Sequence, residues 1–240
     1  MDLFADLHIH SCLSPCGDND MTPGNILGMA AVKGLDVVAI SDHNTARNLP
    51  AAQIIAQAYD ILLVPAMEIT TREEVHMLGY FPDVRRAVEF GQMLKSHLPP
   101  RKNRPSLFGE QLVMDAEDNV VDQEDALLIG ATDLNLTECA ALVRQAGGVP
   151  VPAHINRGSN GLLVNLGLLP AEPYFSTVEV WKALPCPLEA TENKHVIHSS
   201  DAHYLGDIAE REFMLRLPEK SVDALLRWMD SKKAPEGGAS

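Results

Sequence analysis

Runs of apolar residues alternate with amphipathic stretches along nearly the whole chain of 240 residues. The apolar runs at 35–43 and 149–155 are almost continuous, which is typical of parallel strands that are covered on both faces. The stretch at 22–34 has a helical pattern, with Thr22 as a capping residue and Gly34 at its end. The pattern predicts strands at 2–10, 35–43, 61–70, 73–81, 149–155, 176–181 and 195–203, and helices at 22–34, 49–60, 83–98, 137–148 and 219–230.

Strands that alternate with helices predict an α/β fold with a parallel sheet, and both an open doubly wound sheet and a closed barrel fit this order. Residues 99–135 interrupt the rhythm with two short β-like pieces around 117–119, so we predict an inserted β-hairpin there. Its acidic residues lack the glycine and the final glutamate of an EF-hand calcium loop, so they are expected to form a solvated surface. We expect one domain over 1–232, followed by a flexible tail at 233–240.

Composition and charge narrow the class of protein. Hydrophobic residues make up 46% of the chain and aromatic residues 5%, so the core is expected to be aliphatic. The formal net charge of −14 repels polyanions, which makes long nucleic acid an unexpected partner. Because the chain has neither an apolar run of about 18 residues nor a basic region followed by an apolar stretch, we expect no membrane span and no secretory signal. Four cysteines are too few for a disulfide framework, so a cytoplasmic location is expected.

Histidines and carboxylates gather where the predicted strands end. His8 and His10 are two residues apart, so on a strand their side chains point to the same side. Six histidines and three carboxylates lie at or just beyond strand ends: His8, His10, Asp42, His43, Glu68, His76, His154, Asp201 and His203. Such a set is what a multi-metal hydrolytic site needs, and it suits zinc, iron or manganese. Functional residues at the ends of many strands favour the barrel over the open sheet.

Four motifs occur in the order that is usual in the PHP (polymerase and histidinol phosphatase) family. They are DLHIHS at 6–11, AISDHN at 39–44, VPAHI at 151–155 and SSDAH at 199–203. The chain resembles this family over residues 1–216. The resemblance implies a distorted (β/α)7 TIM-like barrel of PHP type, two or three bound divalent metal ions (Zn, Mn or Fe) and hydrolysis of phosphate esters.

The resemblance also implies three metal positions, of which the third is the most exposed. Their ligands would be, in order, His8, His10, Glu68 and Asp201; Glu68, His76 and His154; and Asp18, His43 and His203. Glu68 would bridge the first two positions. Asp18 lies five residues before Pro23, which is the usual spacing, but the loop is longer than usual and Asp20 is an alternative.

The expected activity is that of a metal-dependent phosphoesterase, in which a hydroxide that bridges two metals attacks a small phosphomonoester or a nucleotide. His43, His203 and Asp201 are candidates for catalytic proton transfer, although a third metal would compete for the same histidine atoms. Arg157 and Lys182 are candidates for binding the substrate phosphate, because each follows a motif or a strand end closely.

Three other functions stay open at this point: an exonuclease on short single strands, an amidohydrolase, and a non-catalytic metal-bound module that binds a partner. Amidohydrolases also begin with H-x-H but usually bridge their metals with a lysine. The oligomeric state is not indicated. Asp42 either orients a histidine or caps a strand end, and Glu179 is placed to face inward. Cys12 and Cys16 are expected to pack as small residues, because no second cysteine pair completes a zinc site.

Overall fold

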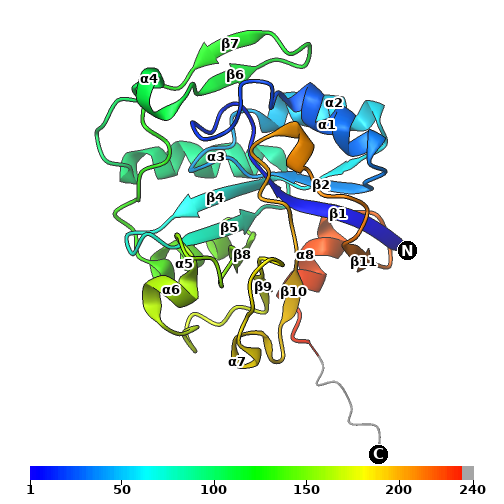
Figure 1. The fold of residues 1–240 in the computed structure, drawn as a ribbon, viewed down its shortest axis with the longest axis vertical. Helices are drawn as coiled ribbons and strands as arrows, with labels where there is room; N and C mark the ends of the chain where they lie inside the picture. Colours follow the sequence, from blue (N-terminus) through cyan, green and yellow to red (C-terminus); the bar gives the residue numbers. More distant parts are fainter. Residues whose placement is uncertain (234–240) are drawn as a thin grey trace, which may run out of the picture.

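The computed structural model describes residues 1–233 as a mixed α/β fold (Figure 1). Its largest sheet has four strands, in the order β11 (Met214–Arg216), β1 (Asp2–Ile9), β2 (Val37–Ile40) and β3 (Leu62–Leu63). β1, β2 and β3 are parallel, as their apolar runs predict. β11 has no counterpart in the predicted pattern and pairs antiparallel with β1. Apart from residue 233, the predicted tail lies outside the described residues.

The second sheet is antiparallel, which corrects the prediction of one parallel sheet. Its order is β4 (Ala66–Thr70), β5 (His76–Tyr80) and β8 (Val149–Pro152), with both pairings antiparallel. The connection at 71–75 is too short for the crossover that a parallel pair needs. The single strand predicted at 61–70 is two strands, because Pro65 lies between β3 and β4 and has no N–H for a ladder.

No closed barrel forms within residues 1–233, so the predicted (β/α)7 barrel is not confirmed. β9 (Thr177–Glu179) and β10 (His195–Ile197) form a separate parallel pair. Isolated bridges join the pieces, since His43 pairs with Glu68 and Ile9 pairs with Ala202. The carboxyl ends of β1, β2, β4 and β10 therefore meet at one edge without a continuous ladder.

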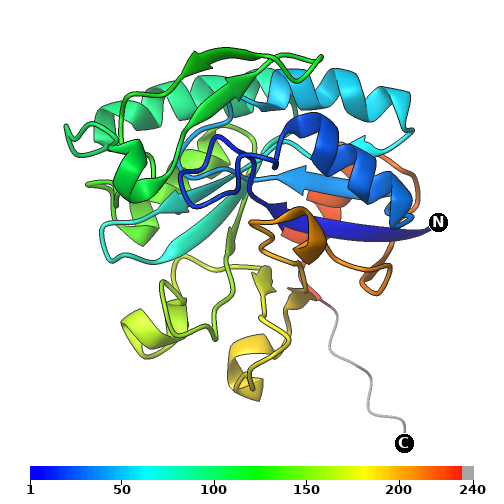
Figure 2. The same ribbon diagram turned by 45° about the horizontal axis from the view of Figure 1, so that its top comes forward.

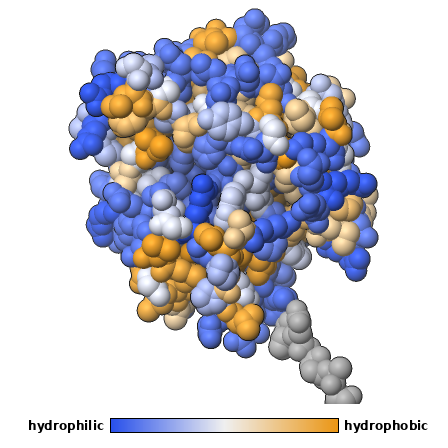
Figure 3. All heavy atoms as spheres, viewed as in Figure 1, coloured by the Kyte–Doolittle hydropathy of each residue, from blue (hydrophilic) through white to orange (hydrophobic). Residues whose placement is uncertain are grey.

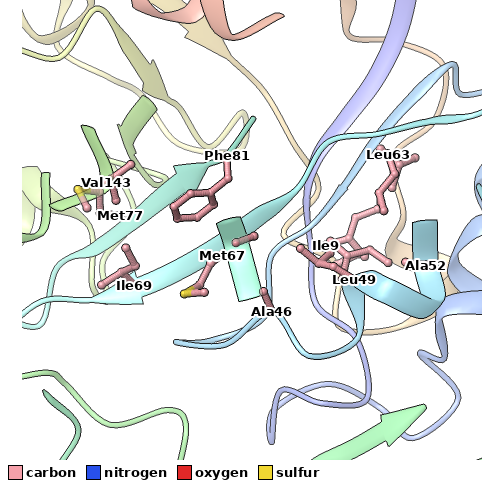
Figure 4. Close-up of a cluster of buried hydrophobic side chains, with 14 of the residues drawn as sticks. Ile9, Ala46, Leu49, Ala52, Leu63, Met67, Ile69, Met77, Phe81 and Val143 are labelled. Carbon is pink, nitrogen blue, oxygen red and sulfur yellow. The ribbon is translucent and has the colours of Figure 1, made fainter. Parts of the chain in front are cut away.

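Helices cover the sheets and enclose a mainly aliphatic interior. The longer ones are α1 (Pro23–Val32), α2 (Leu49–Ala58), α3 (Val84–Leu94), α5 (Leu136–Gln145) and α8 (Val222–Asp230), all where the pattern predicts them. The short ones are η1 (Lys95–His97), α4 (Pro105–Phe108), α6 (Leu162–Leu166), α7 (Leu188–Thr191) and η2 (Leu205–Asp207). α1, α2, α3 and α5 contribute to one core cluster, in which Met67 and Phe81 are fully buried (Figure 4). α8 packs on a second cluster with β1 and β8.

The predicted hairpin insertion is present as β6 (Leu112–Met114) paired antiparallel with β7 (Val120–Gln123). It forms an outer layer over the helices, as Figures 1 and 2 show. At its tip, the Asp118 carboxylate accepts hydrogen bonds from Thr22 Oγ1 at 2.7 Å and from the Gly24 N–H at 3.0 Å. A carboxylate beside the first turn of α1 is favourable because that turn has unpaired N–H groups. The acids of the insertion were expected to face solvent, but Asp118 anchors the hairpin to the start of α1.

The surface is mostly hydrophilic in the view of Figure 3, and apolar side chains gather in its lower part. Figure 1 places the short helices α6 and α7 in that region. Each of them buries only one residue, so Val164 and Leu188 remain 55% and 81% exposed. Within residues 1–233, no helix combines the length and apolar character that crossing a bilayer demands.

Candidate metal centre

The side chains predicted from the strand ends meet at one edge of the sheets. His8 is in β1 with His10 just after it, and Glu68 is in β4. Because β5 runs antiparallel to β4, its first residue, His76, lies beside the carboxyl end of β4. β8 is antiparallel to β5 as well, so His154, which follows β8, reaches the same edge.

Glu68 is the centre of this cluster. Its carboxylate is 1% exposed, and five imidazole nitrogens lie within 3.3 Å of its oxygens. Oε1 is 2.8 Å from His76 Nδ1, 3.2 Å from His154 Nε2 and 3.3 Å from His8 Nε2, and Oε2 is 3.2 Å from His43 Nδ1 and 3.3 Å from His10 Nε2. A carboxylate with nitrogen ligands gathered at both oxygens suits a bridge between two cations.

Asp201 supplies a second carboxylate to the cluster. Its Oδ1 is 3.2 Å from His10 Nε2 and 3.4 Å from His8 Nε2, and its Oδ2 forms an ion pair with Arg157. The guanidinium of Arg157 also lies over the ring of Trp181, 4.9 Å from its centroid. Arg157 therefore connects the cluster to the surface beside it.

Two carboxylates outside the cluster fix its inner histidines. His8 Nδ1 is 3.0 Å from Glu179 Oε2, which only accepts, so Nδ1 carries a proton and Nε2 is the nitrogen that faces the cluster. Ser14 Oγ donates to Asp42 Oδ1 at 2.7 Å and lies 3.1 Å from His10 Nδ1, so it accepts the proton of that nitrogen. Such partners are typical of metal-binding histidines. Asp42 therefore orients His10 through Ser14, and Glu179 faces inward as expected.

Two residues of the cluster have a strained backbone. His154 has a φ of 26° and Asp201 a φ of 50°. Positive φ is unusual for residues other than glycine and costs roughly 1–3 kcal/mol per residue. Contacts hold both residues in place, because the His154 N–H donates to Glu179 Oε2 at 2.9 Å and Arg157 pairs with Asp201. Strain of this kind is concentrated at functional sites.

Opposite charges set the pKa values of the cluster. Burial lowers the pKa of His10, but hydrogen bonds and charge from Asp201 and Glu68 outweigh burial and raise this pKa to about 9. Burial alone would raise the pKa of Glu68, yet the imidazoles of His76 and His8 hold this pKa well below its usual value. Burial, followed by the charge of His10, lowers the pKa of His43 well below its usual value. Without metal, Glu68 is therefore ionised, His10 protonated and His43 neutral near pH 7.

The donor set fits divalent metal ions better than it fits protons. His8 Nε2 and His10 Nε2 are 3.2 Å apart, and two N–H groups cannot point at each other at that distance. The Nδ1 atoms of His43 and His76 are buried and form no hydrogen bond, although they lie 3.2 and 2.8 Å from the oxygens of Glu68. Unsatisfied buried polar atoms are rare in native proteins. Zinc, iron or manganese would satisfy these nitrogens together with the two carboxylates.

The cluster opens into a pocket of about 200 Å³. Besides members of the cluster, it is lined by Cys16, Ile129, Arg157, Ser159 and Asn160. Pockets that enclose a whole small molecule usually measure about 300–1,000 Å³. This pocket therefore suits a phosphate group with a small part of its substituent, and the rest of a larger substrate would lie outside it.

Three residues singled out from the sequence lie apart from the cluster. The Asp18 carboxylate accepts a hydrogen bond from the Asp20 N–H at 2.9 Å, and neither residue joins a group of possible metal ligands within residues 1–233. The geometry therefore does not support either of them as a ligand. Lys182 pairs with Glu212 at 3.1 Å and lines a different pocket, so its role as a phosphate contact has no support either.

Cys16 is a site residue that the sequence interpretation missed. It was expected to pack as a small residue, but it lines the pocket beside His10, His43 and His203. The available signal was its place six residues after the second histidine of DLHIHS. The spacing of Cys12 and Cys16 as a pair hides this signal, because a lone pair of cysteines does not predict a zinc site. Only Cys16 faces the cluster, and the Cys12 thiol donates to a main-chain carbonyl at 3.8 Å.

The metal-free protein is expected to lose stability as pH rises. The pKa of His10 is about 9 in the folded protein against 6.5 as its ordinary value, so its contribution is complete below about pH 6.5 and is lost as pH passes 9. The pKa of His8 is raised in the same direction, against the effect of burial, by Glu179, Glu68 and Asp201. Urea unfolding in EDTA at pH 6.5, 7.5 and 9 tests this, and a constant free energy of unfolding would contradict it.

Glu179→Gln is expected to weaken metal binding by about 10–100-fold, which is typical when the partner of a ligating histidine is lost. The glutamine keeps the size of Glu179 but loses the charge that holds the Nδ1 proton of His8. Chelator competition measures the affinity. Glu212→Gln serves as the control, because this exposed acid lies outside the cluster and pairs with Lys182. Equal affinities in the two variants would refute the positioning role of Glu179.

No protein family model matches the chain. A 5'-3' exoribonuclease of Haemophilus influenzae is 30% identical over 128 residues, which is 52% of this chain and 45% of that protein. An uncharacterised protein of Methanocaldococcus jannaschii is 39% identical over 85 residues, or 32% of this chain and 49% of that protein. The chain thus spans less than half the length of these curated relatives.

Solved structures with a similar fold cover nearly the whole chain. A lesion-specific endonuclease from Pyrococcus furiosus has a TM-score of 0.70 at 17% identity, over 95% of this chain and 56% of that one. Endonuclease Q in complex with a 27-mer duplex that carries an abasic lesion has a TM-score of 0.68 at 18% identity, with the same shares of 95% and 56%. A Bifidobacterium adolescentis protein, proposed to be a metal-dependent phosphoesterase, has a TM-score of 0.62 at 19% identity, over 95% of this chain and 96% of that one. The chain therefore has the fold of the PHP-type metal-dependent phosphoesterases that its four motifs indicate.

Proposed function

We propose that this protein is a metal-dependent hydrolase of phosphate esters. The observation that carries the proposal is the gathering of five imidazoles at both oxygens of one buried carboxylate, Glu68. Two or three divalent ions would neutralise and bridge such a set. When bound, the ions supply Lewis acidity for phosphate oxygens and lower the pKa of a water molecule, which provides a nucleophile near neutral pH.

The cluster divides into an inner and an outer part. His8, His10 and Asp201 would hold one ion with Glu68, and His76 and His154 a second, whereas His43 and His203 remain for an outer position. Arg157 lines the pocket, and N–H groups that it does not use on Asp201 would bind a phosphate oxygen. His203 has a side chain that is 25% exposed, which makes it the histidine best placed to hold a proton near a leaving group if no outer ion binds.

The substrate class extends beyond the small phosphomonoester or nucleotide that the sequence favoured. Net charge predicted that long nucleic acid is an unexpected partner, but a protein of the same fold binds a 27-mer duplex and a partial relative is a 5'-3' exoribonuclease. The negative net charge of the chain is therefore not a sufficient reason to exclude long nucleic acid as a substrate, because bound cations would set the local charge of the site. The small pocket suits a phosphate whose substituent extends outward, so we include oligonucleotides as well as nucleotides.

The test is a hydrolysis screen on the metal-stripped protein reloaded with zinc, manganese or iron. The substrates are p-nitrophenyl phosphate, bis-p-nitrophenyl phosphate, nucleotides, 5'-labelled RNA and DNA single strands, and a duplex with an abasic site. We expect metal-dependent release of product from at least one of them. Metal binding without any such turnover would favour the non-catalytic binding module. Turnover of amide substrates alone would favour the amidohydrolase, which the central carboxylate of Glu68 argues against.

A further inference from the structure

We propose that the Cys16 thiolate binds the outermost metal ion of the cluster, together with His43 and His203. This inference rests on the proposed metal centre and adds a ligand that the motifs do not assign. One ligand atom each of Cys16, His10, His43 and His203 lie within 4.8 Å of one another. His10 Nε2 is 3.2 Å from Asp201 Oδ1 and so belongs to an inner position. Three protein ligands and an open place remain for the outer ion.

The loop between β1 and α1 turns Cys16 toward the pocket. At the next residue, a Cβ on Gly17 would lie 2.5 Å from the carbonyl oxygen of Ser11, so this tight path requires glycine. The Asp18 N–H then donates to the His203 carbonyl at 2.9 Å, which fastens the loop beside another proposed ligand. Asp18 thus contributes through its main chain, and the side chain that faces the pocket is Cys16.

Each residue of this group keeps one atom that can bind an ion. His43 is 3% exposed; its Nδ1 lies 3.2 Å from Glu68 Oε2, and its Nε2 has no hydrogen-bond partner within residues 1–233. His203 Nδ1 is 2.8 Å from the Asp201 carbonyl, which only accepts, so Nδ1 holds the proton and Nε2 has a free lone pair. No group of another described residue accepts a hydrogen bond from the Cys16 thiol, whereas Cys12 has such an acceptor at 3.8 Å.

A thiolate ligand changes the chemistry of the outer position. Sulfur favours zinc or iron over manganese, so this position would discriminate among metals that the inner positions accept. Three protein ligands with an open place are the pattern of catalytic zinc sites, and Cys16, His43 and His203 all line the pocket that a substrate would enter. Because one nitrogen cannot bind an ion and transfer a proton at once, His43 and His203 are assigned here as ligands.

Cobalt(II) substitution tests this assignment without relying on turnover. The wild type, Cys16→Ser and the matched control Cys12→Ser are stripped and titrated with cobalt, and the near-ultraviolet thiolate-to-cobalt charge-transfer band is followed. We expect the band in the wild type and in Cys12→Ser. We expect its loss in Cys16→Ser, together with at least about tenfold weaker binding of the last metal equivalent, while the inner positions still load. X-ray absorption of the zinc-loaded wild type should show a sulfur neighbour at about 2.3 Å, a result that needs no variant.

The possible failures are distinct. A wild type that binds no cobalt or zinc overturns the proposed function and this inference together. A wild type that binds metal and hydrolyses phosphate esters, but shows neither the band nor a sulfur neighbour, overturns only the role of Cys16. A band that persists in Cys16→Ser or disappears in Cys12→Ser likewise refutes the assignment. If Cys16→Ser does not fold, the X-ray absorption of the wild type decides.

Discussion

Glu68→Gln is expected to abolish phosphate ester hydrolysis, with a loss of at least about 10³-fold, and to reduce the bound metal. Glutamine keeps the size of the side chain but removes the negative charge at which five imidazoles converge. It also offers only one oxygen where the bridge needs two. Metal content after dialysis and turnover of the best substrate from the screen measure the two effects.

The control for this variant is another buried carboxylate outside the cluster. Glu124 is 4% exposed and pairs with Arg47 and Lys95 at the hairpin side of the molecule. Glu124→Gln is expected to cost stability, because it removes the buried charge that pairs with Arg47 and Lys95, but to leave metal content and turnover unchanged. If Glu68→Gln retained full metal content and turnover, the bridging role of Glu68 would be wrong.

His10→Ala has the second large effect, a loss of turnover of at least about 10³-fold with release of metal. Its Nε2 faces both carboxylates of the cluster, at 3.3 Å from Glu68 and 3.2 Å from Asp201. Without the His10 imidazole, no ligand nitrogen would lie between the carboxylates of Glu68 and Asp201. His97→Ala is the matched control, since His97 pairs with Asp133 on the surface at 2.7 Å.

His10 is fully buried, so the alanine variant also leaves a cavity that lowers stability. His10→Gln fills more of that space and separates the two effects. We expect it to unfold closer to the wild-type temperature and still to lose metal and activity. A His10→Gln variant that kept both metal stoichiometry and turnover would show that His10 is no ligand.

Local sequence signals predicted the helices and most strands correctly, but not how all the strands pair. Periodicity and capping residues placed all the longer helices, and apolar runs placed β1 and β2. The direction of β5 depends on its pairing with β4 and β8, which no local pattern encodes. β11 has only three residues and is fixed by its ladder with β1, so its own composition carried too little signal.

The sequence by itself determined which residue types gather at the strand ends, because the motifs with His8, His43 and Asp201 are local and keep their order along the chain. Only the tertiary structure decided how these side chains are oriented. Glu179 contacts His8, and Ser14 contacts His10, only because the fold brings these strands and loops together. The same holds for Cys16, which lines the pocket where Asp18 does not, since the path of a loop depends on its contacts with distant segments, which a residue pattern does not contain.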